Sequence, residues 1–350
     1  MTARAASAAA TLPAEWSLQS GVMLTWPHAE GDWTPLLATV EPVFATIAAA
    51  ISRFELVLIV CRDEPHRRHI ATLLERKDVR DDSLRFHFAG SNDTWARDHG
   101  PITVLAGDRP LLLDFSFNGW GGKYPADLDN HINRTLHAAG AFGAAELRHV
   151  DFVLEGGSID SDGAGTLLTT TTCLLSPTRN PGQTQRDIEA VLKRYLGTAR
   201  VLWLQHGYLA GDDTDAHVDM LARFCDRRTI AHVSCDDSGD EHYGALQQMT
   251  TELRKMSTLE GEPYRLIPLP LPAPKYDHDG RRLPASYANF LIINDAVLVP
   301  QYDDLADNLV ISRLADCFPR REMVPIPASS LIRQNGSIHC LTMQLPRGVL

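Results

Sequence analysis

The chain has 350 residues, of which 44% are hydrophobic and 22% are charged, and its formal net charge is −11. This balance is typical of a globular protein with a sizeable core, and the negative charge disfavours nucleic acid and weakly favours cationic ligands. No apolar run approaches the ~18 residues of a membrane span, so the sequence predicts no membrane segment.

The first residues, "MTARAASAAAT", are rich in alanine but lack the apolar centre of a secretory signal. We therefore expect residues 1–11 to be a loose tail and residues 12–350 to form a single domain. Without export, the expected location is the reducing cytoplasm, where the six cysteines would be free thiols. Their wide spacing includes no CxxC pair and does not suggest zinc.

Helix-like and strand-like stretches alternate along the chain, which indicates an α/β fold class. Helices are predicted from the spacing of apolar positions, and strands from β-rich composition. A proline-rich stretch is read as a surface loop because strand-like sequence follows it directly. In chain order these are a helix at 34–54, strands at 54–60, 110–117 and 165–176, a helix at 185–197, a strand at 199–204, a helix at 243–256, the loop at 266–282 and a strand at 289–300.

Weak internal similarity suggests a repeat. The stretch "LEGGSID" (154–160) is similar to "QNGSIHC" (334–340). Polar clusters at Asp98, Glu155, His217 and Cys340 follow one another at intervals of about 60, 60 and 120 residues. A module of about 60 residues, present five times, would fill the chain and bring each cluster to the same end of its own module.

Two of these clusters lie at predicted turns. "NDTWARDHGP" (92–101) places Trp95, Arg97 and Asp98 before a Gly-Pro turn signal, which suits binding of a planar charged group. A purely structural Arg–Asp pair is the alternative. "VLEGGSID" (153–160) places Glu155 at the end of an apolar strand, where the carboxylate is either functional or simply solvated.

The third cluster is "GDDTDAHVDMLARF" (211–224). His217 and Asp219 flank one residue, so in an extended segment both side chains would project from the same face. This arrangement suits a proton-transferring histidine beside an acid that holds a cation. The alternative is a metal site that uses His217, Asp219 and one carboxylate from Asp212, Asp213 or Asp215, although no other nitrogen ligand lies at typical metal spacing.

The fourth cluster is "NGSIHCLTMQ" (335–344). Cys340 is either a small buried residue at the start of a final strand or a nucleophile. A nucleophilic thiol needs a histidine or a positive field, and a carboxylate to orient that histidine. The adjacent His339 would point to the opposite face of a strand, so His217 is the expected partner.

Two carboxylates near a thiol repel its thiolate form. A cationic substrate bound between them would offset this repulsion. A guanidinium is planar and presents N–H donors in a fork that carboxylates match in a bidentate manner. Once bound, its charge would favour the thiolate and polarise the carbon to be attacked. The cluster set therefore predicts chemistry on a guanidinium group.

Together with the motifs around them, these clusters resemble a known family. Its motifs "WARDHGP", "FNGWGGKYP", "LEGGSID", "GTLLTTTTCLLSPTRNPG", "GDDTDAHVDMLARF", "LPASYANFLI" and "GSIHCLTMQ" occur in the order found in the agmatine deiminase and bacterial peptidylarginine deiminase family, within the guanidine-modifying penteins. The resemblance extends from "PAEW" over nearly the whole chain. One departure is Ala216, because a glycine commonly precedes the catalytic histidine in that family.

The resemblance implies a pseudo-symmetric five-bladed α/β propeller of ββαβ modules with the active site on the central axis. It also implies the roles of five residues. Cys340 would be the nucleophile, His217 the acid and base, Asp98 and Asp219 the clamps for the guanidinium, and Glu155 the carboxylate that orients the histidine.

The expected reaction is hydrolytic deimination through a covalent thiouronium on Cys340, with no metal and no cofactor. Agmatine is the favoured substrate and N-carbamoylputrescine its product. Peptidylarginine, giving peptidylcitrulline, and a non-catalytic guanidine- or polyamine-binding protein are the alternatives. We expect Trp95 or Trp120, together with Asp212 or Asp213, to meet the distal amine of agmatine. The expected partner is a small cationic guanidinium compound, with neither nucleic acid nor membrane, and self-association is left open.

Overall fold

The computed structural model describes residues 10–350, and residues 1–9 of the predicted tail lie outside the described residues. Thr11, the last residue of that predicted tail, exchanges two backbone hydrogen bonds with Leu105, and the backbone N–H of Leu12 donates to Leu196. The chain is therefore already part of the fold at Thr11.

Within the described residues, the strands form five separate mixed sheets. The first contains both the earliest and the latest strand of the chain, in the order β16 (Thr342–Pro346), β1 (Gln19–Thr25), β2 (Leu56–Cys61) and β3 (Leu84–Phe88). The other four have three strands each, in chain order: β4 (Ile102–Ala106), β5 (Arg109–Ser116) and β6 (Glu146–Val153); β7 (Ile159–Ser161), β8 (Thr166–Thr170) and β9 (Arg200–Leu204); β10 (Ala222–Asp226), β11 (Thr229–Ser234) and β12 (Arg265–Pro270); and β13 (Leu291–Ile293), β14 (Ala296–Gln301) and β15 (Glu322–Pro327).

One topology is repeated in all five sheets. Two strands pair antiparallel, a helix follows, and the chain returns as a strand parallel to the second one. The helices at these crossovers are α1 (Leu37–Ser52), α5 (Ile132–Ala138), α7 (Gln185–Leu196), α8 (Tyr243–Leu253) and α9 (Asp307–Cys317). The first sheet adds α2 (Glu64–Glu75) and β3. The α/β class and the fivefold repeat inferred from the sequence agree with this topology.

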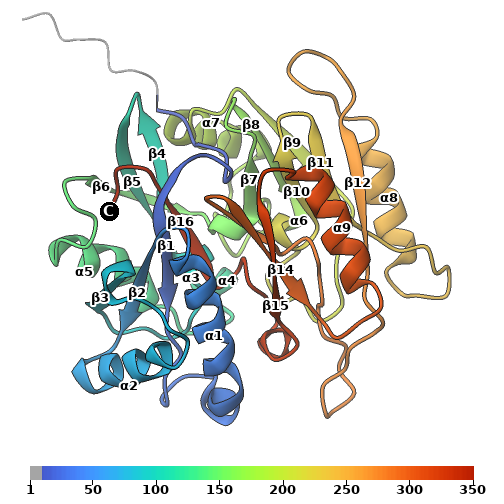
Figure 1. The fold of residues 1–350 in the computed structure, drawn as a ribbon. Coiled ribbons are helices and arrows are strands. Elements are labelled where there is room, and N and C mark those ends of the chain that lie inside the picture. Colours follow the sequence, from blue (N-terminus) through green and yellow to red (C-terminus); the bar gives the residue numbers. More distant parts are fainter. Residues whose placement is uncertain (1–9) are drawn as a thin grey trace, which may run out of the picture.

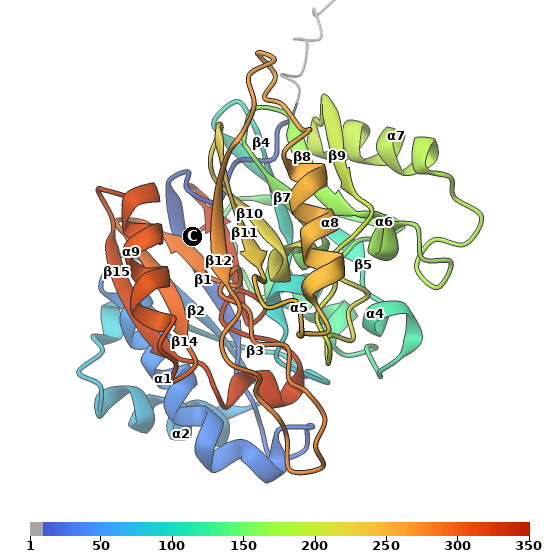
Figure 2. The same ribbon diagram turned by 90° about the vertical axis from the view of Figure 1, so that its right-hand side faces the viewer.

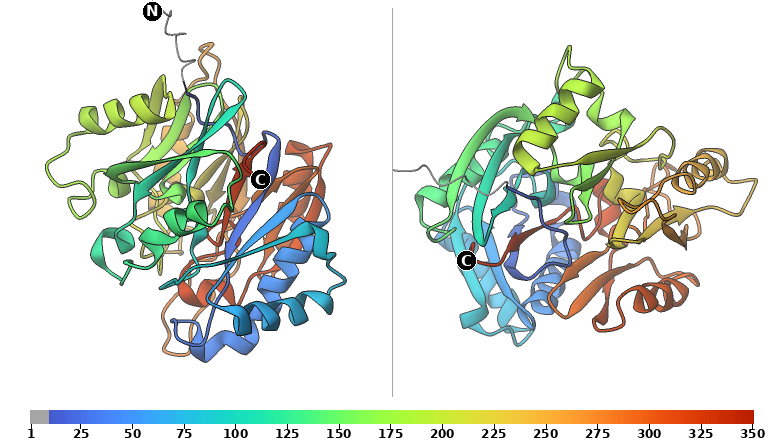
Figure 3. Two further views of the ribbon diagram at one scale, coloured as in Figure 1. Left: turned by 90° about the vertical axis from the view of Figure 1, so that its left-hand side faces the viewer. Right: turned by 90° about the horizontal axis from the view of Figure 1, so that it is seen from above.

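The modules follow one another around the molecule. Figures 1 and 2 show the long helices on the outside and the strands toward the middle, and the view from above in Figure 3 shows successive parts of the chain arranged in turn. The inner strands are almost entirely buried, as their continuous apolar runs require: every residue of β8 and β13 is buried. This arrangement brings the inner ends of different modules close together.

Local sequence explains where several elements begin and end. Helix α7 begins with a capping box between Thr184 and Asp187 and ends at Gly197, whose φ of 68° is the left-handed conformation that favours glycine. The strand predicted at 165–176 ends earlier, because the Thr170 hydroxyl accepts the Cys173 N–H and starts the short helix α6 (Thr171–Leu174). Residues 289–300 form a hairpin of two strands, and the first part of the predicted loop at 266–282 is strand β12.

The prediction that no segment is long and apolar enough to span a membrane was wrong for helix α1. Together with the short 3₁₀ turn before it, residues Thr34–Ser52 are long and apolar enough to cross a membrane by length and composition alone. Its buried residues include Val40, Phe44, Ile47 and Ile51, and the helix contacts β2, α2 and β15. A core helix of a globular protein shows this same inward-facing apolar stripe.

Candidate active site

Short helical turns at the inner ends of four modules carry the candidate residues. Asp98 lies on α3 (Ala96–His99), and Glu155 immediately precedes the 3₁₀ turn η4 (Gly156–Ser158). The turn η5 (Val218–Met220) carries Asp219 and follows His217, and Cys340 lies just before β16. Turn η4 contacts both α3 and η5, so residues far apart in sequence meet at one place.

The thiol of Cys340 lies in an acidic, buried environment. The side chain is 5% exposed, and its Sγ accepts a hydrogen bond from Asn289 Nδ2 at 3.1 Å and lies 3.6 Å from Asp219 Oδ2. Burial, followed by the negative charges of Asp219 and Asp98, raises the pKa of this thiol well above its ordinary value. A cation bound between the carboxylates would oppose both of these charges and favour the thiolate.

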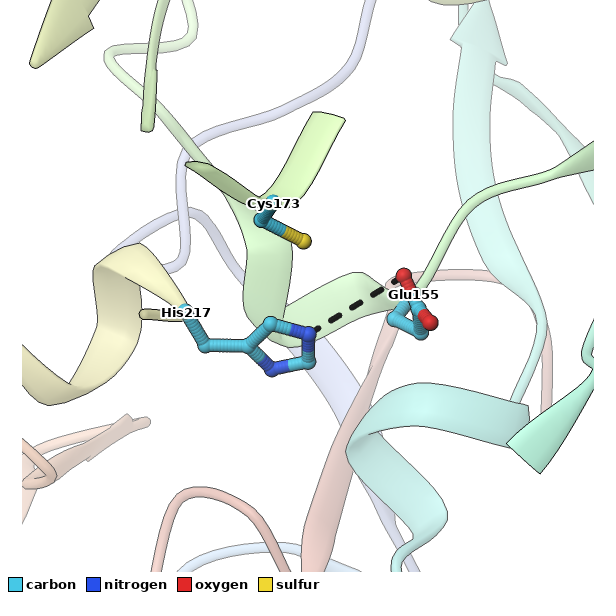
Figure 4. Close-up of side chains that lie close together, drawn as sticks. All are labelled: Glu155, Cys173 and His217. Atoms are coloured by element: carbon cyan, nitrogen blue, oxygen red, sulfur yellow. Dashed lines mark ion pairs between the residues drawn. The ribbon is translucent and has the colours of Figure 1, made fainter. Parts of the chain in front are cut away.

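His217 is buried between two carboxylates. Its Nδ1 lies 3.6 Å from Asp98 Oδ1 and its Nε2 lies 3.9 Å from Glu155 Oε2, beyond hydrogen-bond distance, and Nε2 has no hydrogen-bond partner among the described residues (Figure 4). Burial alone would lower the pKa of His217, but Asp98, Cys173 and Glu155 outweigh it and raise the pKa well above 6.5. The imidazole is therefore held in its charged form, ready to donate a proton.

The prediction that His217 and Asp219 lie in an extended segment was wrong. His217 caps a 3₁₀ turn, and Ala216 before it has a φ of 62°, in the left-handed region. Glycine adopts this backbone conformation without the steric cost that alanine bears. Both side chains nevertheless face the same buried region, since a Cβ at Gly157 would lie 2.7 Å from His217 Nδ1 and 3.1 Å from Asp219 Oδ2.

Both aspartates are held by hydrogen bonds, but only Asp219 has a carboxylate oxygen without a hydrogen-bond partner among the described residues. Asp98 accepts the Gly157 N–H at 3.0 Å on Oδ1 and the Trp120 indole N–H at 2.9 Å on Oδ2. Asp219 accepts from His339 Nδ1 at 2.8 Å and from Asn289 Nδ2 at 3.3 Å, both on Oδ2. Its Oδ1 is buried and has no hydrogen-bond partner among the described residues, which is uncommon for a buried carboxylate oxygen.

The charges of these aspartates are tuned in opposite directions. Burial raises the pKa of Asp98 to about 6, with His217 opposing the rise and Asp219 adding to it. Burial also acts to raise the pKa of Asp219, but His339 and the other cations outweigh it and lower the pKa. Asp219 is thus the more firmly ionised carboxylate of the pair.

Glu155 is not a solvated carboxylate. It is completely buried, and both of its oxygens lie 2.9 Å from Nε of Arg179, which is itself buried. The guanidinium of Arg179 also donates to the carboxylate of Asp215 and to the carbonyl of Thr214, which lie in the loop that precedes His217. Arg179, which the sequence interpretation did not single out, therefore ties the two segments together.

One group of side chains has the composition of a metal site. Ligand atoms of Glu155, Cys173 and His217 all lie within 4.8 Å of one another (Figure 4). Arg179 holds both Glu155 oxygens, so a cation at this position would have to displace a buried guanidinium. We derive no step through a metal here.

The alternative metal set predicted from the sequence is not assembled by its loop. Asp215 is paired with Lys123 and Arg179. The carboxylate of Asp212 accepts hydrogen bonds from Thr214 and from the Ala216 N–H. Asp213 instead accepts from the hydroxyl of Tyr124 at 2.6 Å and from Asn335 at 2.9 Å.

A narrow cavity open to the surface reaches Cys340 and Asp98. Three of the four residues predicted to meet a distal amine line this cavity, namely Trp95, Trp120 and Asp213. The prediction for Asp212 was wrong, because its carboxylate is turned into its own loop and does not line the cavity. The further lining residues are Asp32, Asp93, Tyr124, Thr214, Met220, Gln334, Asn335 and Gly336.

Several residues around the site were missed by the sequence interpretation. Asn289 contacts Asp219 and Cys340 from the segment before β13, and its only signal was membership of the motif "LPASYANFLI". Asp93 accepts the indole N–H groups of Trp33 and Trp95, and it stands two residues before Trp95 in a motif that was noted. Asp32 gave no signal of its own.

Comparison with solved structures places the fold among the deiminases. A structure from Porphyromonas gingivalis, provisionally described as an arginine deiminase, is 48% identical with a TM-score of 0.90, covering 97% of this chain and 99% of that one. A cysteine-to-serine variant of the C. jejuni agmatine deiminase with substrate bound is 39% identical with a TM-score of 0.89, covering 97% of both chains.

Sequence comparison identifies the family. The family described as Porphyromonas-type peptidyl-arginine deiminase matches residues 11–346, and this chain belongs to that family. The agmatine deiminase of Stutzerimonas stutzeri is 33% identical over 364 residues, covering 96% of this chain and 95% of that protein. The family predicted from the sequence motifs is confirmed.

Proposed function

We propose that this protein is an agmatine deiminase that converts agmatine and water to N-carbamoylputrescine and ammonia. The observation that carries the proposal is a thiol beside two buried aspartates, one of which has an oxygen without a partner. Among the described residues lining the cavity none is Lys or Arg, while Asp32, Asp93, Asp98 and Asp213 are all acidic. Such a cavity attracts a cation with a positive charge at each end.

In the proposed mechanism, Asp98 and Asp219 hold the guanidinium and Cys340 attacks its central carbon. Binding of the cation releases the thiol proton, and the thiolate forms the C–S bond. His217 donates its proton to one nitrogen as the C–N bond breaks, so that ammonia leaves and a thiouronium remains on Cys340.

The same histidine completes the hydrolysis. Neutral His217 takes a proton from water as the oxygen bonds to the carbon, and the C–S bond then breaks, returning the electron pair to sulfur. The carbon keeps the oxygen as the ureido carbonyl, and the hydroxyl proton passes to the sulfur and restores the thiol. The proton that the thiol gave up to solvent in the first half converts the departed ammonia to ammonium. Glu155, held by Arg179, keeps negative charge beside Nε2 and supports the charged form of His217 at the start of each turn.

The decisive experiment compares substrates. Wild-type protein should release ammonia and a ureido product from agmatine faster than from free arginine or a blocked arginyl peptide. The cavity offers carboxylates to the amine of agmatine and no cation to the carboxylate of arginine. If the blocked peptide is turned over faster, the substrate is peptidylarginine, which the family's description names, and not agmatine. If agmatine binds but no ammonia is released, the protein is a binding protein and not an enzyme.

The distal amine gives a sharper test of substrate choice. Acetylating it removes a positive charge that we expect to meet Asp213 and the Trp95 ring, so kcat/KM should fall by the equivalent of ~1–3 kcal/mol, as for one desolvated charged contact. Asp213→Asn should lower kcat/KM for agmatine but change it little for N-acetylagmatine. Asp212→Asn is not a suitable control because it breaks loop hydrogen bonds, and Asp236→Asn serves instead. Equal turnover of agmatine and N-acetylagmatine would contradict this assignment.

A glycine in the cavity wall provides a test of shape. A Cβ at Gly336 would lie 2.2 Å from the Trp95 ring, so Gly336→Ala must push the indole out of place. We expect kcat/KM for agmatine to fall by about tenfold or more and the free energy of unfolding by about 1–3 kcal/mol. Gly244→Ala in α8, where nothing lies within 4 Å, is the matched control and should leave kcat/KM unchanged without lowering the free energy of unfolding. Wild-type kcat/KM in Gly336→Ala would show that Trp95 does not shape the substrate site.

We further propose that residues 12–350 form one catalytic domain in which the five modules close into a pseudo-symmetric propeller with the cavity on its axis. The repeated topology and the succession of modules around the molecule in Figure 3 support this arrangement. A cytoplasmic location is also proposed, supported by six cysteines that are all free.

A further inference from the structure

A second buried chain of side chains contacts Asp219 at Oδ2, the oxygen that also lies near the Cys340 sulfur. His339 Nδ1 is 2.8 Å from Asp219 Oδ2, and His339 Nε2 is 2.7 Å from Glu15 Oε2. All three residues are at most 5% exposed. They come from the segment before β1, from η5 and from the segment before β16, so the contact joins three distant parts of the chain.

The geometry fixes the state of the histidine. Each ring nitrogen of His339 faces a carboxylate oxygen, and an ionised carboxylate can only accept. Both contacts are therefore hydrogen bonds when the ring has two N–H groups, the form that carries a positive charge. Glu15 is anchored in turn by Arg223 at 2.8 Å and by the Ile292 N–H at 2.7 Å. Burial alone would raise the pKa of Glu15, but Arg223, His339 and Arg97 hold it well below its usual range.

This chain decides which face of Asp219 is offered to a ligand. His339 and Asn289 both occupy Oδ2, which leaves Oδ1 as the buried oxygen without a partner. A charge-assisted bond from His339 fixes the carboxylate more strongly than a neutral donor would. If the side chain rotated, the free oxygen would be lost from the position where the second clamp is needed.

We propose that His339, oriented and kept charged by Glu15, is a positioning residue that holds Asp219 ionised and in the rotamer that clamps the guanidinium. The inference rests on the proposed function and extends it, because it assigns a task to the histidine beside the nucleophile and to the acid of the N-terminal "PAEW" segment.

Other charged groups surround this chain and must be considered in any pH experiment. Those near Glu15 and His339 are Arg97 of α3, Asp160 of β7, Arg223 of β10, and Glu55 and Arg321 of the segments before β2 and β15. Those near Asp219 on the side of the nucleophile are Asp98, His217 and Cys340. None of these groups is altered in the pH test, which keeps Cys340 intact and changes only His339, so a change in the pH profile can be attributed to His339.

The binding test uses Cys340→Ser, which cannot form the thiouronium, as the parent. In this background His339→Ala should weaken agmatine binding, measured by calorimetry, by about tenfold to a hundredfold. His339→Asn retains a neutral donor toward Asp219 and should weaken it less. His232→Asn, at another buried histidine whose ring bonds only to a backbone carbonyl, should bind agmatine like the parent.

The pH test uses the intact nucleophile. Asp219 must be ionised to hold the substrate, and its lowered pKa keeps it so as the pH falls. Asp98, whose pKa is about 6, sets the upper part of the acidic limb of the kcat/KM profile. Without the charge of His339 the pKa of Asp219 rises, so the pH below which this limb steepens from one proton to two should move up in His339→Asn. A residue with a merely structural role would lower the melting temperature without moving this limb.

A third measurement does not depend on substrate. In ¹⁵N NMR spectra near neutral pH, both ring nitrogens of His339 should carry protons in the wild type, and one should lose its proton in Glu15→Gln. If the ring is neutral in the wild type, or if His339→Ala binds agmatine like its parent, the proposal is overturned. If Cys340→Ser fails to bind agmatine and the wild type releases no ammonia from it, the proposed function fails, and the NMR result still decides the state of His339.

Discussion

Replacing Cys340 with alanine should abolish ammonia release from agmatine while leaving the fold and agmatine binding largely intact. The Cys340 thiol is the sulfur that lies beside both clamps, at 3.6 Å from Asp219 and within reach of the charge of Asp98. Acid trapping of the wild type during turnover should reveal an adduct on the peptide that contains Cys340.

Two other thiols provide the controls. Cys173 lies near His217 and Cys225 lies in β10, and both are buried. An adduct on either of them would contradict the assignment of the nucleophile. Cys61→Ala, far from the site in β2, should keep wild-type turnover apart from any loss of stability.

Replacing either clamp, as Asp98→Asn or Asp219→Asn, should reduce kcat/KM by at least about a hundredfold. Each substitution removes half of a charge-assisted pair with the guanidinium and leaves a buried cation less compensated. That loss corresponds to roughly 3 kcal/mol in transition-state binding, which steady-state kinetics with agmatine will measure directly.

Asp236→Asn and Asp237→Asn are matched controls in an exposed loop of the same acidic protein. They should change kcat/KM by less than about threefold, because exposed charges are screened by solvent and salt. Equal losses at all four positions would mean that general acidity, and not a defined site, attracts the substrate.

The site could be predicted where its signal was local. Asp98, Glu155, His217, Asp219 and Cys340 each stood in a short polar motif, and the structure places all five in one buried region. Asp212 was wrong because the direction of a loop side chain depends on its backbone: Asp212 accepts hydrogen bonds from its own loop, whereas its neighbour Asp213 faces the cavity.

Residues whose importance comes from distant contacts were not predictable in this way. Glu15 and His339 are 324 residues apart and meet through a single 2.7 Å contact. Nothing in the periodicity near either residue indicates that contact. His339 was set aside because strand geometry would turn it away from Cys340; in the structure both residues lie in a turn, and the ring of His339 contacts Asp219 and Glu15.

The fold was predictable in its class and less so at element boundaries. Helices 185–197 and 243–256 were found closely because their apolar faces repeat regularly. The threonine-rich stretch 165–176 favoured one long strand by composition, yet the hydroxyl of Thr170 caps a helical turn and ends the strand. The prolines of 266–282 hid strand β12, an edge strand of its sheet, where prolines are tolerated.

The pairing of β1 with β16 has a consequence for how the protein is made. During synthesis β1 emerges early, but its antiparallel neighbour, Thr342–Pro346, is translated more than three hundred residues later. Until then one edge of β1 has no partner, and an unpaired apolar strand is a template for aggregation. Cys340 immediately precedes that late strand, so the nascent chain carries three carboxylates and a histidine but no nucleophile. The catalytic group and the strand that closes the first sheet are completed together.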